Sequence, residues 1–126
     1  MKEIIYTDKA PKPIGPYSQA VKLGNLLFLS GQIGIDPKTN ELVKGGIEEE
    51  TKQILENITN ILKSQNADLT NILKVNIYLK NLEDFKKVNE IYQEYFKDHF
   101  PARTTIGGVL LPKNALIEID VIAYIP

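Results

Sequence analysis

The stretch FPARTTIGGVLLPKNALIEIDVIAYI, Phe100 to Ile125, ends in a segment whose side chains alternate in chemistry. Successive side chains of a strand point to opposite faces, so every second residue shares a face. One face is wholly apolar and consists of Ile117, Ile119, Val121, Ala123 and Ile125. The other mixes carboxylates with large apolar groups: Leu116, Glu118, Asp120, Ile122 and Tyr124. We therefore expect a strand at 116–125 with its apolar face packed against helices.

Two upstream segments have the periodicity of amphipathic helices. Residues 47–66 carry a stripe of mainly apolar side chains, and glutamates at 48–50 in the first turn complement the helix dipole. Residues 82–97 repeat the pattern, with Asn81 placed to cap the start and Pro101 preventing continuation. The sequence predicts helices at 47–66 and 82–97.

Further segments are rich in β-branched or aromatic residues and are bounded by Gly, Pro, Asn or Asp. They are EIIY, SQAVKL, LLFLSG, ILKVNIYL and TTIGGV, at residues 3–6, 18–23, 26–31, 72–79 and 104–109. The order is β-β-β-α-β-α-β-β. The tight turn GNL predicts a hairpin between the second and third strands, and each helix links strands that can lie parallel in a mixed sheet. We expect one α+β domain, residues 1–126.

The predicted helices are too few to cover both faces of this sheet. They suffice for one face, yet the strand at 26–31 is apolar on both faces. An exposed second face would be a larger apolar patch than a monomer usually tolerates. We therefore expect a homo-oligomer joined through the uncovered face.

Composition excludes several kinds of chemistry. The formal net charge is −1 and the lysines are scattered, which disfavours nucleic acid as a partner. The chain has no Cys and a single His, so we expect no metal centre and no Ser-His-Asp triad, and interpret His99 as a helix-end cap or surface residue. The residues MKEIIYTDKAPKP lack the apolar core of a secretory signal, so we expect no leader, and no run approaches the ~20 apolar residues of a membrane span. We expect a cytoplasmic protein.

Arg103 is the single arginine among 15 basic residues. It follows Pro101, where the second predicted helix gives way to a strand. A guanidinium can hold a substrate carboxylate through two parallel hydrogen bonds, which the point charge of lysine cannot reproduce. The alternative role is a surface or inter-subunit salt bridge.

Glu118 lies inside an apolar strand, where a carboxylate is costly unless it is paired, exposed or used for proton chemistry. It is either a catalytic group or an exposed residue of an amphipathic strand, and Asp120 on the same face has a weaker claim. Tyr17 and Ser30 stand in the turn-flanked segments GPYSQA and FLSGQIG. Taken singly, each is a structural hydroxyl.

Several motifs occur in an order and spacing that cover almost the whole chain. They are PIGPYSQAV at 13–21, LFLSGQIGIDP at 27–37, VNEIYQEYF at 88–96, FPARTT at 100–105 and LPKNALIEIDVIA at 111–123. Together they resemble the reactive intermediate deaminases, the RidA (YjgF-like) family. The resemblance implies a chorismate-mutase-like α+β fold with a mixed sheet of about six strands and two helices on one face. It also implies a homotrimer, ligand clefts between subunits and no cofactor.

By position, the resemblance assigns carboxylate binding to Arg103 and water handling to Glu118. It places the remainder of the pocket at Tyr17, Ser30, Gly31 and the backbone of Thr105. Many relatives have cysteine at the position of Thr105, so a thiol has no role here. Asn114 stands where glycine is common, and asparagine tolerates the same left-handed turn.

The reaction implied by the resemblance is hydrolysis of 2-imino acids, formed from enamines such as 2-aminoacrylate, to 2-oxo acids and ammonia. The alternative is a non-catalytic trimeric regulator that binds 2-oxo acids or amino acids, although a pure carboxylate binder gains nothing from Glu118. Chorismate mutase activity would favour several arginines, and ribonuclease activity would need a basic groove or a usable histidine. Both rank below the first two.

Overall fold

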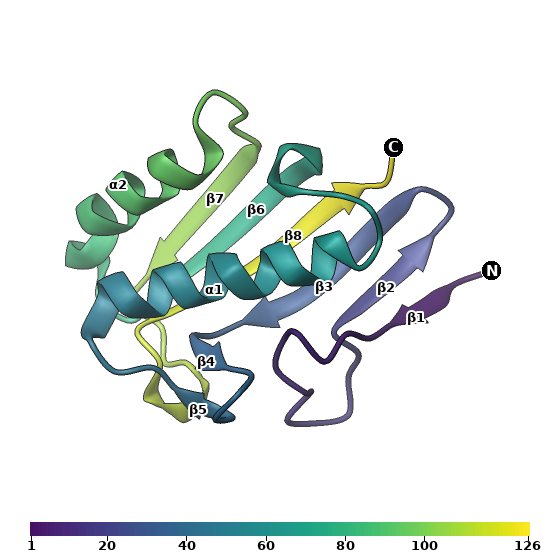
Figure 1. Ribbon diagram of the computed structural model, residues 1–126. Helices are drawn as coiled ribbons and strands as arrows, with labels where there is room; N and C mark the ends of the chain where they lie inside the picture. Colours follow the sequence, from purple (N-terminus) through teal and green to yellow (C-terminus); the bar gives the residue numbers. More distant parts are fainter.

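The protein folds as a mixed sheet with both long helices on one face (Figure 1), as seen in a computed structural model of residues 1–126. In chain order the strands and helices are β1 (Glu3–Ile5), β2 (Ala20–Leu23), β3 (Leu26–Gln32), β4 (Ile35–Asp36), β5 (Glu41–Leu42), α1 (Gly46–Lys63), β6 (Ile72–Leu79), α2 (Phe85–Phe96), β7 (Ala102–Gly107) and β8 (Ile117–Tyr124). Single 3₁₀ turns lie at Leu69–Asn71, Leu82–Asp84 and Pro112–Asn114.

The main sheet has six strands in the order β1-β2-β3-β8-β6-β7. All neighbours are antiparallel except β6 and β7, which are parallel and joined through α2. The predicted hairpin between β2 and β3 forms, with Leu23 opposite Leu26 and Gly24 at φ +60°, a conformation that suits glycine. The predicted α+β fold with its mixed six-stranded sheet is therefore confirmed.

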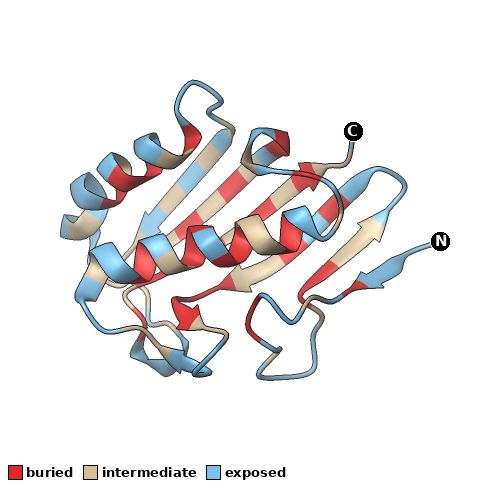
Figure 2. Ribbon diagram, in the orientation of Figure 1, coloured by how far each residue is buried: buried red, intermediate tan, exposed pale blue.

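The helices cover the face of β8 that the sequence predicts to be apolar. Ile117, Ile119, Val121 and Ala123 are each at most 2% exposed. They pack into one core with the inward stripe of α1 and with Val88, Ile91 and Tyr92 of α2. Figure 2 shows this buried layer between the helices and the sheet. Burial of such side chains, worth roughly 1.5–3 kcal/mol each, holds the helices on this face.

The opposite face of the sheet has no helix over it. Phe28 is 41% exposed and Ile106 46% exposed, while Glu118, Asp120 and Ile122 on this face are partly exposed. The expected uncovered face is present. The oligomer inferred from it stays a prediction.

Element ends differ from the predictions where turns replace regular structure. α1 stops at Lys63, because the chain turns at Asn66 (φ 59°) and the Ala67 N–H bonds back to the Leu62 carbonyl. α2 starts at Phe85, three residues later than predicted, and the side chain of Asn81 makes no capping hydrogen bond, so that cap prediction was wrong. The β4–β5 hairpin was missed because each strand has only two residues.

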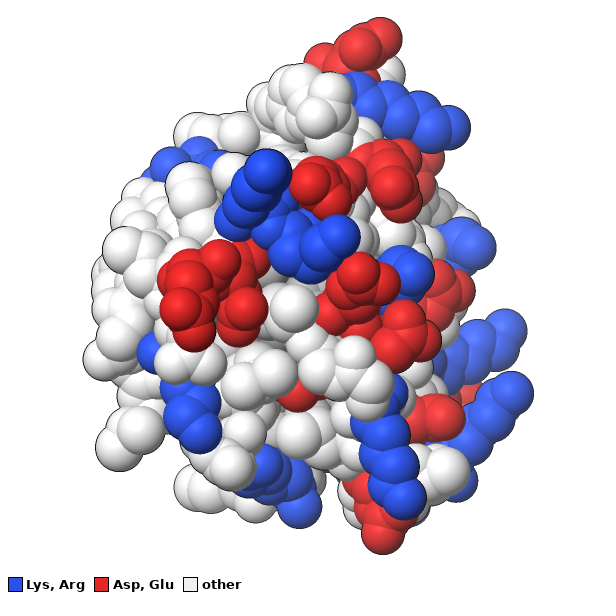
Figure 3. All heavy atoms as spheres, turned by 90° about the vertical axis from the view of Figure 1, so that its left-hand side faces the viewer, with Lys and Arg blue, Asp and Glu red and all other residues white.

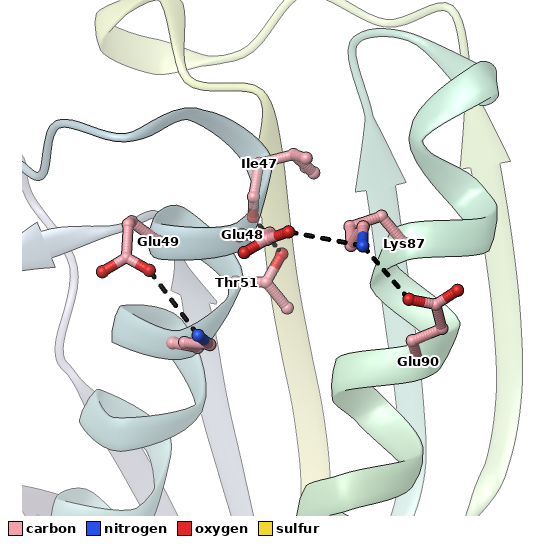
Figure 4. A network of polar contacts seen from close by, with 7 residues as sticks. Ile47, Glu48, Glu49, Thr51, Lys87 and Glu90 are labelled. Atoms are coloured by element: carbon pink, nitrogen blue, oxygen red, sulfur yellow. Dashed lines mark hydrogen bonds and ion pairs between the residues drawn. The ribbon is translucent and has the colours of Figure 1, made fainter.

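An exposed ion-pair network links the two helices (Figure 4). Lys87 of α2 lies 3.3 Å from Glu48 in the first turn of α1 and 3.2 Å from Glu90 on its own helix. Pairs this exposed contribute little to stability, so the shared core and not this network holds the helices in place. None of the helices combines the length and the apolar character needed to cross a membrane.

Candidate active site

Arg103 lies on the helix-covered face of the edge strand β7. Its partner across β6 is Val75, which is fully buried beneath the helices and so fixes the face to which the arginine points. The guanidinium carbon lies 4.7 Å from the ring centroid of Tyr92 and 5.5 Å from that of Phe85, both on α2. The only basic residues that form ion pairs in the chain are Lys52 and Lys87. Arg103 therefore has no acidic partner within the chain.

The arginine opens onto a cleft of about 310 Å³ between α2 and the start of β7. Its lining consists of Asn89, Tyr92, Gln93, Phe100, Pro101 and Arg103. Two buried oxygens in this lining, Asn89 Oδ1 and the Tyr92 hydroxyl, have no hydrogen-bond partner, and neither has Thr105 Oγ1 on β7. Buried polar atoms are normally satisfied, so unpaired ones beside a cation indicate a place for a polar ligand. Burial raises the pKa of Tyr92 to about 12, although the nearby positive charge of Arg103 acts in the opposite direction, and the hydroxyl is protonated at neutral pH. The Tyr92 hydroxyl is near the guanidinium but does not meet the geometry of a hydrogen bond with it.

Glu118 lies on the uncovered face of β8, against the backbone of β3. A Cβ placed on Gly31 would overlap Glu118 Oε2 and lie 2.9 Å from its Cδ, so a side chain at this position would displace the carboxylate. The β3–β8 register shifts between Leu29 and Gln32, which frees the backbone at Gly31 from regular pairing. Burial, and then the negative charge of Asp120, raise the pKa of Glu118. The carboxylate is thereby made a better base, as general base catalysis requires.

Ser30 and Tyr17 are both tied into the chain by hydrogen bonds. Ser30 Oγ donates to the Ser18 carbonyl oxygen at 2.6 Å, and the Tyr17 hydroxyl accepts from the Ile14 N–H at 3.2 Å. Tyr17 is nevertheless 45% exposed. The Ser30 bond holds the loop before β2 beside the Gly31 segment of β3, and the Tyr17 bond lies within that loop.

Asp120 belongs to a polar cluster on the same uncovered face. It accepts a hydrogen bond from Asn76 Nδ2 at 2.8 Å. Burial raises the pKa of Tyr78, and the nearby carboxylates of Asp120 and Glu118 raise it further. Asp120 is thus held by its neighbours and acts on Glu118 through its charge.

The predicted site residues form two groups within one chain. Arg103 and Thr105 lie on the covered face of β7, beside Val75 and Ile77. Ser30, Gly31 and Glu118 lie together on β3 and β8, and Glu118 pairs with Tyr78 on the uncovered face. Since β6 separates β8 from β7, a single chain does not bring Arg103 and Glu118 together.

Two other residues behave as the sequence predicts. His99 is an exposed residue just beyond α2, and its N–H donates to the Phe96 carbonyl. Asn114 has φ 57°, the left-handed turn expected at a position where glycine is common.

Comparisons with known proteins identify the family. A family model described as endoribonuclease L-PSP matches residues 7–125. A RutC family protein of Pyrococcus horikoshii is 56% identical over 124 residues, covering 98% of both chains. The chain belongs to the RidA (YjgF-like) family. This RidA-family chain is also 48% identical over 123 residues to a human protein named 2-iminobutanoate/2-iminopropanoate deaminase, covering 98% of this chain and 90% of the human one. Its fold matches the crystal structure of RidA from an Antarctic Psychrobacter with a TM-score of 0.94 and 41% identity, covering 98% and 99% of the two chains.

The aromatic and amide residues beside Arg103 were missed as site residues. Phe85 and Tyr92 appear in the sequence only as members of an apolar helical stripe, and Asn89 lies between Val88 and Glu90 without any distinguishing pattern. The motif VNEIYQEYF contains two of them, and that motif was the available signal.

Proposed function

We propose that this RidA-family chain is a hydrolytic deaminase of 2-imino acids, such as the imine tautomer of 2-aminoacrylate. The observation that carries the proposal is Arg103, a guanidinium without an acidic partner that faces a cleft with unpaired polar atoms. The human relative named as a 2-iminobutanoate/2-iminopropanoate deaminase supports the same substrate class. Glu118, with its raised pKa, supplies the base that a mere carboxylate receptor would lack.

The complete site lies between subunits of a homotrimer. One subunit contributes Arg103 and the backbone of Thr105, and its neighbour contributes Glu118, Gly31, Ser30 and Tyr17. Two facts favour this arrangement: the groups lie on opposite faces within one chain, and apolar side chains such as Phe28 stay exposed on the uncovered face.

The chemistry needs positioning and one proton carrier. Arg103 holds the substrate carboxylate through two parallel hydrogen bonds. Glu118 takes a proton from water as the water oxygen bonds to the imine carbon, and passes it to the nitrogen to give a carbinolamine. Glu118 then transfers the hydroxyl proton of the carbinolamine to the same nitrogen as the C=O bond of the product forms. The C–N bond breaks, ammonia leaves and the 2-oxo acid remains, with no cofactor consumed. Such imines already hydrolyse in water, so a few kcal/mol of positioning suffices.

The surface does not favour the nuclease activity named by the family description. Figure 3 views the side of the molecule that carries α2, and lysine and acidic side chains are interspersed there. A nuclease needs a concentrated positive field along its groove, and the net charge of this chain is −1.

A coupled assay tests the activity. A pyridoxal-phosphate-dependent dehydratase generates 2-aminoacrylate from serine, and pyruvate release is followed with and without this protein. We expect faster release without added metal or cofactor. Binding of 2-oxobutanoate without any acceleration would instead support the carboxylate-binding regulator.

A mixing experiment tests the shared site. Arg103→Ala and Glu118→Gln chains, each nearly inactive, are dissociated and reassembled together. Random assembly gives roughly a quarter of sites with both wild-type groups, and activity should return to that level. Sedimentation equilibrium should give three times the chain mass, and a 14.2 kDa species would contradict the trimer.

A further inference from the structure

The guanidinium of Arg103 is held between aromatic rings and not by charge. Tyr92 and Phe85 lie seven residues apart on α2, about two turns of the helix, so both face β7. Their ring centroids lie 4.7 Å and 5.5 Å from the guanidinium carbon, within the range of cation–π contacts. We name these two residues the aromatic clamp.

The clamp has a rigid support. Tyr92 is 5% exposed, and its ring stacks on Phe96 with centroids 4.3 Å apart. The Tyr92 side chain therefore cannot follow the arginine if the arginine moves. Phe85 is more open, at 36% exposed, and its ring lies farther from the guanidinium carbon than that of Tyr92.

Aromatic rings can order the Arg103 side chain without occupying its N–H donors, which an acidic partner would occupy. A free arginine side chain has many rotamers, and ordering it costs free energy at the moment of binding. A carboxylate partner would order it but would also occupy the N–H donors that the substrate needs. Ring faces restrain the guanidinium plane through its π-surface and leave its N–H edge available.

We propose that the aromatic clamp of Phe85 and Tyr92 is a positioning device that pre-sets Arg103 to receive the substrate carboxylate. The inference rests on the proposed function for its substrate, although the clamp itself can be tested without turnover. Neither ring is a catalytic residue, because each acts through the arginine.

The first test uses the fact that the chain has a single arginine, so its Nε–Hε group gives one peak in a ¹H–¹⁵N spectrum. In the wild type, ring currents should displace this peak upfield. Tyr92→Leu should move it toward the position of a free arginine, and Tyr92→Phe should leave it upfield. Tyr95→Leu is the matched control, because Tyr95 is on the same helix and faces a different pocket, beside Glu49 and Glu56. An unchanged peak in Tyr92→Leu would overturn the clamp.

The second test measures the dissociation constant of 2-oxobutanoate by calorimetry. Loss of one cation–π contact predicts a roughly 2- to 30-fold weaker affinity in Tyr92→Leu and in Phe85→Leu. Tyr92→Phe should recover most of that loss. If Tyr92 acts through the arginine, Tyr92→Leu should weaken binding no further in an Arg103→Ala background. Equal effects in both backgrounds, or no binding by the wild type, would contradict the proposal.

Turnover separates this inference from the proposed function. In an active enzyme, loss of the clamp should raise KM more than it lowers kcat, since a carboxylate contact made throughout the reaction is weakened. A mutant that is only misfolded would lose kcat with an unchanged KM, and this result would count against the clamp. A wild type that binds 2-oxobutanoate without turnover would refute the deaminase and leave the clamp to be judged by its peak and its affinities.

Discussion

Arg103 and Glu118 are held by opposite means on opposite faces of the sheet. On the covered face, packing of α2 supplies the rings that restrain the cation. On the uncovered face, the carboxylate occupies the space left by a missing side chain at Gly31. In the buried layer, neighbouring side chains position the charged group, whereas on the open face the space left in the backbone of β3 positions it. Each half of the site can therefore be damaged without disturbing the other.

The largest effect should follow from Glu118→Gln. The substitution keeps the shape of the side chain and removes the base. General acid–base catalysis contributes roughly 10²–10⁴-fold, so kcat should fall by that order. Affinity for 2-oxobutanoate, measured by calorimetry, should change little because Arg103 is intact. Equal kcat in mutant and wild type would remove Glu118 from the mechanism.

Gly31→Ala should come next. The added Cβ must displace the carboxylate of Glu118 without touching Arg103. Misplacement of a reacting group by about 1 Å can cost on the order of 10²-fold, and we expect such a loss in kcat. Gly15→Ala is the control, because a Cβ there meets Tyr17 carbon atoms at an ordinary 3.5 Å. Full activity in Gly31→Ala would show that the space is not needed.

Arg103→Lys tests the covered half of the site. It keeps the charge and loses the planar fork that both the rings and the carboxylate use. Loss of one charge-assisted hydrogen bond is worth roughly 1.5–3 kcal/mol, or about one to two decades in kcat/KM. Steady-state kinetics measure this, and thermal unfolding checks that the fold is retained. A Lys variant with wild-type kcat/KM would mean that charge alone suffices.

Asp120→Asn should change the pH dependence more than the rate. Asp120 raises the pKa of Glu118, so removing its negative charge should lower that pKa. A base is active when deprotonated, and the acidic limb of the kcat/KM profile should therefore move to lower pH. If the acidic limb of the kcat/KM profile stayed in place or moved to higher pH, Asp120 would not be raising the pKa of the catalytic base.

The smallest effect concerns a carboxylate outside the site. Glu50 of α1 is 4% exposed and accepts a hydrogen bond from the Leu116 N–H at 2.9 Å, just before β8. Burial raises the pKa of Glu50. The hydrogen bond from Leu116 lowers this pKa in part, and the negative charge of Asp84 raises it further. The Glu50 carboxyl contributes fully to the free energy of unfolding at pH values below its pKa in the unfolded protein. This contribution is lost as pH rises through the higher pKa that Glu50 has in the folded protein.

Glu50→Gln keeps an acceptor for Leu116 and has no charge to bury. We expect the variant to melt at the same or a slightly higher temperature than the wild type at pH 7. The difference should shrink toward pH 4, where the wild-type carboxyl is protonated in both states. Calorimetric melting curves at both values measure this, with the exposed Glu83→Gln as control. If Glu50→Gln lowered the melting temperature relative to wild type more at pH 7 than at pH 4, the result would contradict a raised pKa of Glu50.

Most of the fold could be predicted because side-chain periodicity is a local property. The stripe of α1 and the alternation of β8 appear directly in the sequence, and both faces have the predicted burial. The start of α2 could not be predicted from Asn81, because a 3₁₀ turn that bonds Asp84 N–H to the Asn81 carbonyl replaces the expected cap. The β4–β5 hairpin was too short to show any period.

The site divides in the same way. Composition identifies Arg103 as the lone guanidinium, and side-chain alternation shows that Glu118 interrupts an apolar strand. The folded structure was needed to show that the two groups face opposite sides of the sheet, that Tyr92 lies beside the guanidinium, and that Glu118 lies against Gly31. Those relations depend on which strands are neighbours and on registers such as Val75 opposite Arg103, and packing between distant segments sets both.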